Sequence, residues 1–96
     1  MTPRFHPAAE MELAAAVNVG ETRGWNLGAE LLRESRRVID LLCEQPLIGE
    51  PVDADRRRFP LKRFPFGIVY RVDGDALRIL AFAHRRQRPK YWRKRT

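Results

Sequence analysis

The hydrophobic period of the chain changes near Arg56, and this change constrains the fold more than any other feature of the sequence. Before it, apolar residues recur at the spacing of one helical face, at Leu27, Leu31, Val38 and Leu42. After it, apolar residues alternate along the chain, and β-branched and aromatic types become frequent, which is typical of strands. The sequence therefore predicts an α+β protein, with helices in its first half and a sheet in its second.

The N-terminal segment is expected to form a short strand followed by a helix. Residues 2–6 make an extended candidate that ends at Pro7, whose ring suits the first turn of a helix. Strong helix formers follow from Ala8, and glycines are expected to end this helix between Val19 and Arg23.

A second helix is predicted after the first, so that the two form a hairpin. Asn26 is its expected N-cap. Pro46 closes the helix, and residues 47–55 are expected to form a loop.

The second half is expected to form an antiparallel sheet of three to four strands. Asp73 and Gly74 are predicted to be the two-residue turn of a hairpin, which places Val72 opposite Asp75. Residues 58–64 form a further strand candidate, whose prolines suit an edge or a bend. The register predicted for the face under the helices pairs Tyr70 with Leu77, Ile68 with Ile79 and Phe66 with Ala81. The same register places Arg71, Arg78 and His84 on the other face, with His84 opposite Arg63.

Charge is divided unevenly along the 96 residues. Residues 1–55 carry five Lys or Arg against ten Asp or Glu, a net of −5, whereas residues 56–96 carry fourteen against two, a net of +12. Clustered like charges repel one another unless a partner neutralises them, so the second half is expected to meet a polyanion or an acidic protein surface. The length fits one domain over residues 1–96.

Most enzyme classes find no support in the sequence. It contains no phosphate-binding glycine loop, no paired cysteines at metal-ligand spacing and no serine nucleophile motif. His6 and His84 are the only histidines, too few for a typical zinc site, so neither a metal nor a cofactor is expected. The single Cys43 indicates a reducing compartment, and no apolar run exceeds five residues, so we expect a cytoplasmic protein.

The segment 84–95 holds the densest set of candidate functional groups. Guanidinium groups match phosphate oxygens, imidazole titrates near neutral pH, and aromatic rings offer a nucleobase a stacking platform. For an RNA-cleaving site, the candidate catalytic residues are His84, Arg86 and Tyr91. The candidates for binding a target or a partner protein are Arg58, Lys62, Arg63, Arg78, Arg85, Arg88 and Trp92. The alternative is that the arginines form a solvated or partner-binding surface and that Tyr91 and Trp92 anchor the end of the chain by packing.

Short motifs follow one another in a characteristic order along almost the whole chain. They are Phe5-His6-Pro7-Ala8-Ala9, Glu12-Leu13, Gln45-Pro46, Arg63-Phe64-Pro65-Phe66, Ile68-Val69-Tyr70-Arg71, Ala83-His84 and Pro89-Lys90-Tyr91-Trp92. Together they resemble the RelE/ParE toxin superfamily. The resemblance implies the toxin of a type II toxin–antitoxin system, held in a hetero-oligomer by a small antitoxin. That antitoxin is expected to be ParD-like, with a ribbon-helix-helix start and a C-terminal segment that wraps the toxin.

Two activities divide this superfamily, since RelE-like members cleave mRNA on the ribosome and ParE-like members inhibit DNA gyrase. Arg58 and Tyr91 lie near positions that RelE-type nucleases use. Those nucleases also place an arginine and a lysine where this chain has Gly67 and Pro60, and glycine cannot stabilise charge on a reacting phosphate. The resemblance therefore favours the ParE-like branch and inhibition of gyrase by binding. A RelE-like ribosome-dependent mRNA endonuclease remains the alternative, because related toxins use a histidine near the C-terminus, as His84 is here. A third class is a nucleic-acid-binding or decayed module without toxicity.

Overall fold

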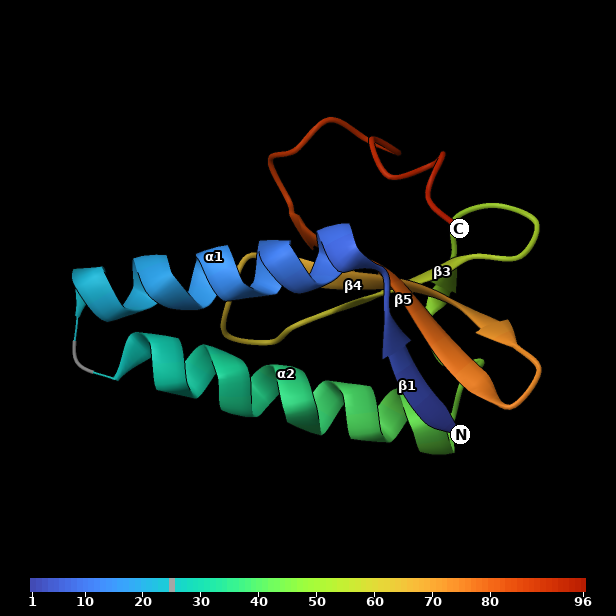
Figure 1. Cartoon of the computed structure of the whole chain (residues 1–96), viewed down its shortest axis with the longest axis horizontal. Coiled ribbons are helices and arrows are strands. Elements are labelled where there is room, and N and C mark those ends of the chain that lie inside the picture. Colours follow the sequence, from blue (N-terminus) through green and yellow to red (C-terminus); the bar gives the residue numbers. More distant parts are fainter. Residues whose placement is uncertain (25) are drawn as a thin grey trace.

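The chain folds as a helical hairpin packed against a mixed five-stranded sheet (Figure 1). This computed structural model describes residues 1–24 and 26–96. In chain order the elements are β1 (Thr2–Phe5), α1 (Pro7–Arg23), α2 (Leu27–Glu44), β2 (Glu50–Pro51), β3 (Arg57–Pro60), β4 (Phe66–Asp73) and β5 (Ala76–His84). The α+β class and the order of strand, two helices and further strands are as predicted.

Helix α1 begins where the sequence predicts it. His6 is the N-cap, and its Nδ1 accepts a hydrogen bond from the N–H of Ala8 at 3.0 Å. Pro7 lies in the first turn, where a helix has no acceptor for a backbone N–H. The helix ends at Arg23, before Gly24 and within the predicted interval.

Helix α2 begins after Asn26 as predicted, but Asn26 makes no side-chain capping bond. Its backbone is left-handed, with φ of 56°, and it turns the chain from one helix into the next. The helices approach closely at this end, since a Cβ on Gly20 would lie 2.8 Å from the backbone nitrogen of Gly28. The hairpin thus depends on two glycines that face each other.

The sheet has the strand order β1-β5-β4-β3-β2. The expected antiparallel sheet of three to four strands is therefore wrong in two respects, because five strands form and β1 pairs with β5 in parallel. The parallel pair is possible because two helices and three strands separate β1 from β5 in sequence. The N–H of His6 extends the pair by donating to the carbonyl of Ile79 at 2.8 Å. The expected loop over residues 47–55 contains the short strand β2, in which Glu50 pairs with Arg58.

The β4–β5 hairpin is correctly predicted, but its register is not. Asp73 pairs with Ala76, so the turn residues are Gly74 and Asp75, and Gly74 has the positive φ of 62°. A β-bulge then leaves Leu80 between two pairs. The observed pairs that replace the predicted ones are Tyr70 with Ile79, Ile68 with Phe82 and Phe66 with His84. His84 therefore lies opposite Phe66 and not opposite Arg63.

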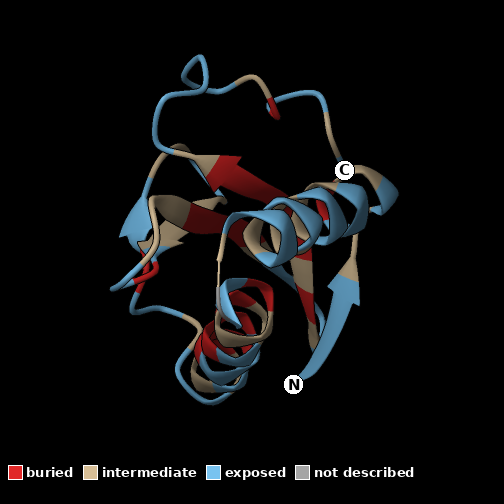
Figure 2. Cartoon of the chain, turned by 90° about the vertical axis from the view of Figure 1, so that its left-hand side faces the viewer, coloured by how far each residue is buried: buried red, intermediate tan, exposed pale blue. Residues whose placement is uncertain are grey.

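The bulge changes which side chains reach each face of the sheet. On the helix side, Ile68, Tyr70 and Phe82 are buried with residues of both helices. On the other side, Leu80, Ala81 and Ala83 are buried in a second cluster. Figure 2 shows buried segments mainly on α2 and through the central strands, whereas α1 is largely intermediate or exposed. The sheet is therefore covered on both faces, by the helices on one and by the C-terminal segment on the other.

Candidate functional site

The C-terminal segment 85–96, called the tail from here on, lies over the sheet face that the helices leave open. Trp92 is only 4% exposed and packs in the cluster with Val69, Leu80, Ala81 and Ala83. The guanidinium of Arg56 lies 5.3 Å from the centre of the Trp92 ring and donates to the carbonyl of Arg93 at 2.8 Å. In Figure 1 the tail runs along the top of the view and α2 along the bottom. Trp92 thus anchors the tail by packing, and its ring is not part of a free surface.

Glu12 of α1 ties the tail to both the helices and the sheet. Its carboxylate accepts hydrogen bonds from the hydroxyl of Tyr91 at 2.8 Å and from the N–H of Phe82 at 3.0 Å. Arg95 binds the same carboxylate with two nitrogens, at 2.8 and 3.1 Å, and lies over the Tyr91 ring at 5.1 Å. This arrangement joins α1, β5 and the tail in one network.

The network determines the protonation of Tyr91. Burial raises the pKa of Tyr91, and the hydrogen bond to the Glu12 carboxylate raises it further. The bond from its guanidinium to Glu12 likewise raises the pKa of Arg95. Tyr91 is therefore a neutral phenol whose proton is directed at Glu12, which suits a structural tie better than proton transfer to a ligand.

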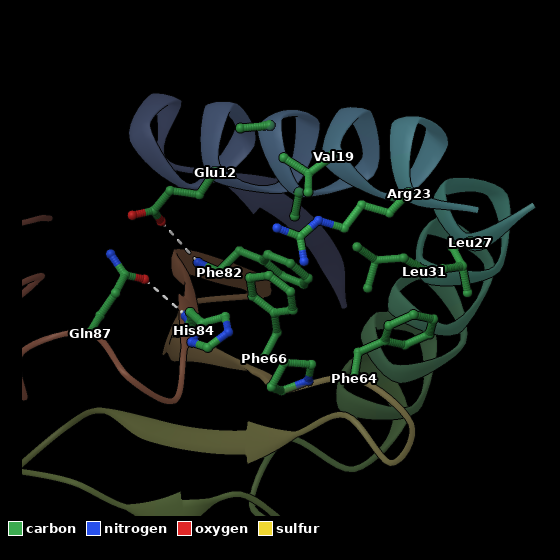
Figure 3. Close-up of a pocket in the computed structure, with 14 residues that line it drawn as sticks. Glu12, Val19, Arg23, Leu27, Leu31, Phe64, Phe66, Phe82, His84 and Gln87 are labelled. Carbon is green, nitrogen blue, oxygen red and sulfur yellow. Dashed lines mark hydrogen bonds between the residues drawn. The ribbon is translucent and has the colours of Figure 1, made fainter.

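His84 ends β5 at the point where the tail turns away from the sheet. The Nδ1 of its ring accepts a hydrogen bond from the backbone N–H of Arg86 at 3.0 Å. The backbone N–H of His84 donates to the Oε1 of Gln87 at 2.9 Å (Figure 3). The ring packs edge-on against Phe66, with centroids 5.1 Å apart. Because Nδ1 is an acceptor, the neutral ring carries its proton on Nε2. His84 shapes the turn as well as contributing an imidazole to the surface.

Gly67 makes room for an arginine that comes from the neighbouring strand. A Cβ on Gly67 would overlap the guanidinium of Arg58, whose Nη2 lies 2.6 Å from that position. Arg58 is half-buried on β3, and its guanidinium occupies the space that a side chain at position 67 would take. Gly67 places no charged side chain on β4, and it leaves room for the guanidinium of Arg58 from β3.

Two adjoining hollows open beside Arg58, and Arg58 and Arg85 line both of them. The first has a volume of about 410 Å³ and is bordered by the 61–65 loop, including Lys62 and Arg63. The second has a volume of about 380 Å³ and is bordered by His84 and the tail. No Asp or Glu of residues 1–24 and 26–96 lines either hollow. We call the two together the basic cleft.

The loop on one side of the basic cleft is held by α2. Leu61 is buried in the helix-side core, and the N–H of Lys62 donates to the Oε2 of Glu34 at 2.6 Å. Arg63 forms an ion pair with Glu30 at 2.9 Å. This loop is therefore packed on its helix side, and Lys62 and Arg63 are exposed.

The fold brings most of the predicted site residues together. The ones that line the basic cleft are Arg58, Lys62, Arg63, His84, Arg85, Arg88, Tyr91 and Trp92. Arg86 is exposed and lines neither hollow. Arg78 lies six positions before His84 on β5, about 20 Å away along the strand. It donates instead to the carbonyl of Phe5 at 3.2 Å and to that of Thr96 at 3.1 Å.

Three residues that contribute to this region are not among the predicted site residues, namely Glu12, Arg56 and Arg95. For Glu12 a signal was present, since Glu12 lies beside Leu13 on the helix face that Ala9 and Ala16 define, where a carboxylate requires a partner. Arg56 and Arg95 carry no comparable local signal, because both are found only through contacts between distant segments.

A second hollow feature, the apolar groove, lies between the helical hairpin and the 64–66 segment (Figure 3). Its volume is about 550 Å³, and its walls include Leu27 and Leu31 on α2 and Phe64, Phe66 and Phe82 beside the sheet. Four polar side chains also line the groove, namely Arg23, Glu12, His84 and Gln87. Leu27 is 36% exposed and Val19 of α1 is 52% exposed, so apolar surface remains open to solvent here.

Neither a metal site nor a membrane span is found in the part of the chain that the structure describes. Within residues 1–24 and 26–96, no three His, Cys, Asp or Glu side chains come together as metal ligands would. Neither helix, over the same residues, combines the length and hydrophobicity needed to cross a membrane.

Comparisons with known proteins place the chain beside toxins of one class. Residues 4–89 match the family described as the ParE toxin of the type II toxin–antitoxin system, parDE. Among solved structures, the chromosomal ParDE toxin–antitoxin system from P. aeruginosa is similar, with a TM-score of 0.63 and 17% sequence identity. The alignment covers 88% of this chain and 95% of that one, and at this identity the likeness shows the fold alone. A search of curated proteins gave no match.

Proposed function

Because this chain belongs to the ParE toxin family of type II toxin–antitoxin systems, we propose that it inhibits DNA gyrase by binding and that a cognate antitoxin neutralises it. The observation that carries the choice of binding over RNA cleavage is the state of Tyr91. Its hydroxyl is bonded to Glu12, and Arg95 covers its ring. A phenol engaged in this way is a poor acid or base for cutting a phosphodiester.

Two further positions support inhibition by binding. Gly67 and Pro60 pair with each other across β3 and β4, so neither strand carries a cation at this pair. The cations that remain nearby line a cleft without carboxylates, which suits attraction to a negatively charged target. We place this action in the cytoplasm, where gyrase and its DNA are found.

We further propose that the antitoxin covers the apolar groove as well as part of the basic surface. The expected partner is ParD-like, with a ribbon-helix-helix DNA-binding part and a C-terminal segment that wraps the toxin. Apolar side chains of that segment fit Leu27, Leu31 and Phe64, and its acidic side chains fit Arg23, which also lines the groove. The product is a hetero-oligomer in which the toxin is inactive.

A gyrase supercoiling assay tests this proposal. The purified chain is added to gyrase and relaxed plasmid, with and without prior incubation with the neighbouring gene product. We expect the toxin to inhibit supercoiling and the antitoxin to restore it. Unaffected supercoiling at toxin concentrations above that of gyrase would refute gyrase as the target, and a toxin that does not bind the neighbouring gene product would refute the pair.

The RelE-like alternative has one observation in its favour. His84 lines the basic cleft together with Arg85 and Arg88, which is a suitable neighbourhood for a general acid or base beside a phosphate. Incubating the chain with ribosomes and mRNA tests this. Cleavage of ribosome-bound mRNA that is lost in His84→Ala would support the nuclease and contradict inhibition by binding. If expression of the chain alone does not arrest growth, and co-expression with the neighbouring gene product changes nothing, the non-toxic module is the better description.

A further inference from the structure

We propose that the basic cleft binds the phosphodiester backbone of duplex DNA. In the proposed function this DNA is the segment that gyrase holds, so the inference rests on that function for its biological setting. The binding itself is a property of the isolated chain and is tested without gyrase.

The first support is that five cations of the cleft form no ion pair with an Asp or Glu among the residues that the structure describes. Among residues 1–24 and 26–96, the ion pairs of basic side chains with Asp or Glu involve Arg37, Arg56, Arg63, Arg71 and Arg95. The cleft cations outside that set are Arg58, Lys62, Arg85, Arg88 and Lys90. All but Arg58 are exposed. Their charge is therefore free to meet an external anion, and their mutual repulsion is relieved when one binds.

The second support is the positioning of Arg58 at the centre of the cleft. Arg58 lines both hollows, and its guanidinium occupies the space that a side chain at position 67 would take. A half-buried arginine that lies over a strand is more restricted than one on the open surface, so it loses less side-chain entropy on binding. Its planar group is suited to two oxygens of one phosphate.

The third support is the extended distribution of the charges. The hollow beside the 61–65 loop contributes Lys62, the hollow beside the tail contributes Arg88 and Lys90, and Arg58 and Arg85 stand between them. A single small anion would need only one cluster of donors. A row of cations through two adjoining hollows matches a ligand with repeated charges, and duplex DNA carries one negative charge for about every 1.7 Å of its axis.

The aromatic residues distinguish a duplex from a single strand. Proteins that bind single strands stack nucleobases on exposed aromatic rings. Here Trp92 is buried under Arg56, and Tyr91 is covered by Arg95. Phe66 stacks on Phe82 with centroids 4.7 Å apart. The cleft therefore offers charge to a backbone but few platforms to unpaired bases.

The strand pairing argues against an extended acidic peptide as the ligand. Peptides that add to a sheet need a free strand edge. The floor of the cleft is made by β3, β4 and β5, which pair with one another, and β3 also pairs with β2. β2 reaches only Arg57 and Arg58 of β3, and β1 reaches β5 only as far as Ile79. On the rest of β5, the N–H groups of Phe82 and His84 already donate to Glu12 and Gln87, so these main-chain groups are not available to hold such a peptide.

Fluorescence anisotropy of a short labelled duplex, titrated with the full chain at several salt concentrations, tests the inference. We expect log Kd to vary with log salt with a slope of about 0.9 for each phosphate neutralised. Arg58→Gln is expected to weaken binding by about fivefold to tenfold near 0.1 M salt and to reduce the slope by about one. Arg85→Gln with Arg88→Gln is expected to reduce the slope by about two.

Matched variants separate the cleft from net charge. Arg33→Gln with Arg36→Gln removes the same charge from exposed positions on α2 and is expected to leave the affinity close to that of the wild type. Gly67→Ala keeps every charge and only shifts the Arg58 guanidinium, so it is expected to weaken binding less than Arg58→Gln does and to leave the salt slope nearly unchanged. Equal losses from the α2 pair and the cleft pair would overturn the inference, as would tighter binding to single-stranded RNA or to polyglutamate than to the duplex.

The outcome is independent of the gyrase assay. Inhibition of supercoiling by a chain that does not bind DNA would refute the cleft and leave the proposed function intact. DNA binding by a chain that leaves supercoiling unaffected would support the cleft and refute gyrase as the target.

Discussion

Replacing Glu12 by glutamine is expected to detach the tail in part and to lower the free energy of unfolding by about 2 kcal/mol. The Glu12 carboxylate accepts four hydrogen bonds, from Phe82, from Tyr91 and twice from Arg95. Glutamine retains one acceptor oxygen and presents an NH₂ group in place of the other. With that NH₂ in place of Oε2, it faces the Tyr91 hydroxyl and one guanidinium nitrogen of Arg95, both of which are donors.

The size of the effect follows from the exposure of the pair. Hydrogen bonds to charged groups contribute about 1.5–3 kcal/mol each when buried. The side chains of Glu12 and Arg95 are 21% and 19% exposed, so water replaces part of what is lost, and the net effect falls well below the sum of four bonds. For a domain of this size, about 2 kcal/mol corresponds to a fall in Tm of roughly 8–16 °C.

Urea and thermal denaturation followed by circular dichroism measure this effect, and limited trypsin digestion reports on the tail separately. Glu21→Gln is the matched control, since Glu21 is an exposed carboxylate on the same helix. We expect the control to stay within about 0.5 kcal/mol of the wild type. A Glu12→Gln protein with the stability of the control, and with a tail no more sensitive to trypsin, would refute the role assigned to the network.

Three further predictions concern the fold. Tyr70→Phe is expected to cost about 1–3 kcal/mol in urea denaturation, because the Tyr70 hydroxyl donates to Pro46 O at 2.7 Å and accepts from the buried N–H of Gly49 at 3.0 Å; an unchanged midpoint would contradict this. Gly20→Ala is expected to destabilise by about 1–3 kcal/mol, since its Cβ collides with Gly28, although alanine is the better helix former; a gain in stability would show that the helices move apart freely. His6 accepts a hydrogen bond at Nδ1, and burial followed by the charge of Arg78 lowers its pKa below the ordinary 6.5. Its contribution is therefore complete above about pH 6.5 and declines as pH falls towards the lower folded pKa. Denaturation between pH 7.5 and 5 should show this loss in the wild type and less of it in His6→Asn, which keeps a capping side chain without titrating.

Local patterns in the sequence were sufficient to predict both helices and the β4–β5 hairpin, but not the short strand β2. The helix of the second segment follows from its apolar stripe, which ends in Leu42, and the β4–β5 hairpin follows from alternation around Gly74. Both signals lie within a few residues of the structure that they predict. The number and direction of the strands required distant contacts, since nothing near Phe5 indicates a parallel partner at Ile79.

The register failed for a different physical reason. Ile79, Leu80, Ala81 and Phe82 are all apolar and all buried, so the sequence carries no alternation that would reveal a bulge between them. The turn lies one position later than predicted, which shifts the pairing by two residues, and the bulge adds a third, so His84 lies opposite Phe66 and not opposite Arg63. Most of the basic residues that line the cleft were nonetheless among the candidates, because their selection depended on charge and expected exposure and not on the pairing of β4 with β5.

The role of Gly67 in the structure could not be predicted from the sequence. In the sequence, Gly67 indicates only that this position of β4 carries no cation. In the fold it accommodates Arg58, a contact between strands that composition and spacing do not contain. Glu12 is similar, since its partners Tyr91 and Arg95 lie at the far end of the chain.

The measurement that tests inhibition by binding most directly is a gyrase supercoiling titration with the wild type and His84→Ala side by side. If the chain acts by binding, both proteins inhibit, and the variant loses far less than the hundredfold or more that removal of a general acid–base costs an enzyme. If neither protein affects supercoiling, and the wild type alone cleaves ribosome-bound mRNA, inhibition of gyrase by binding is contradicted.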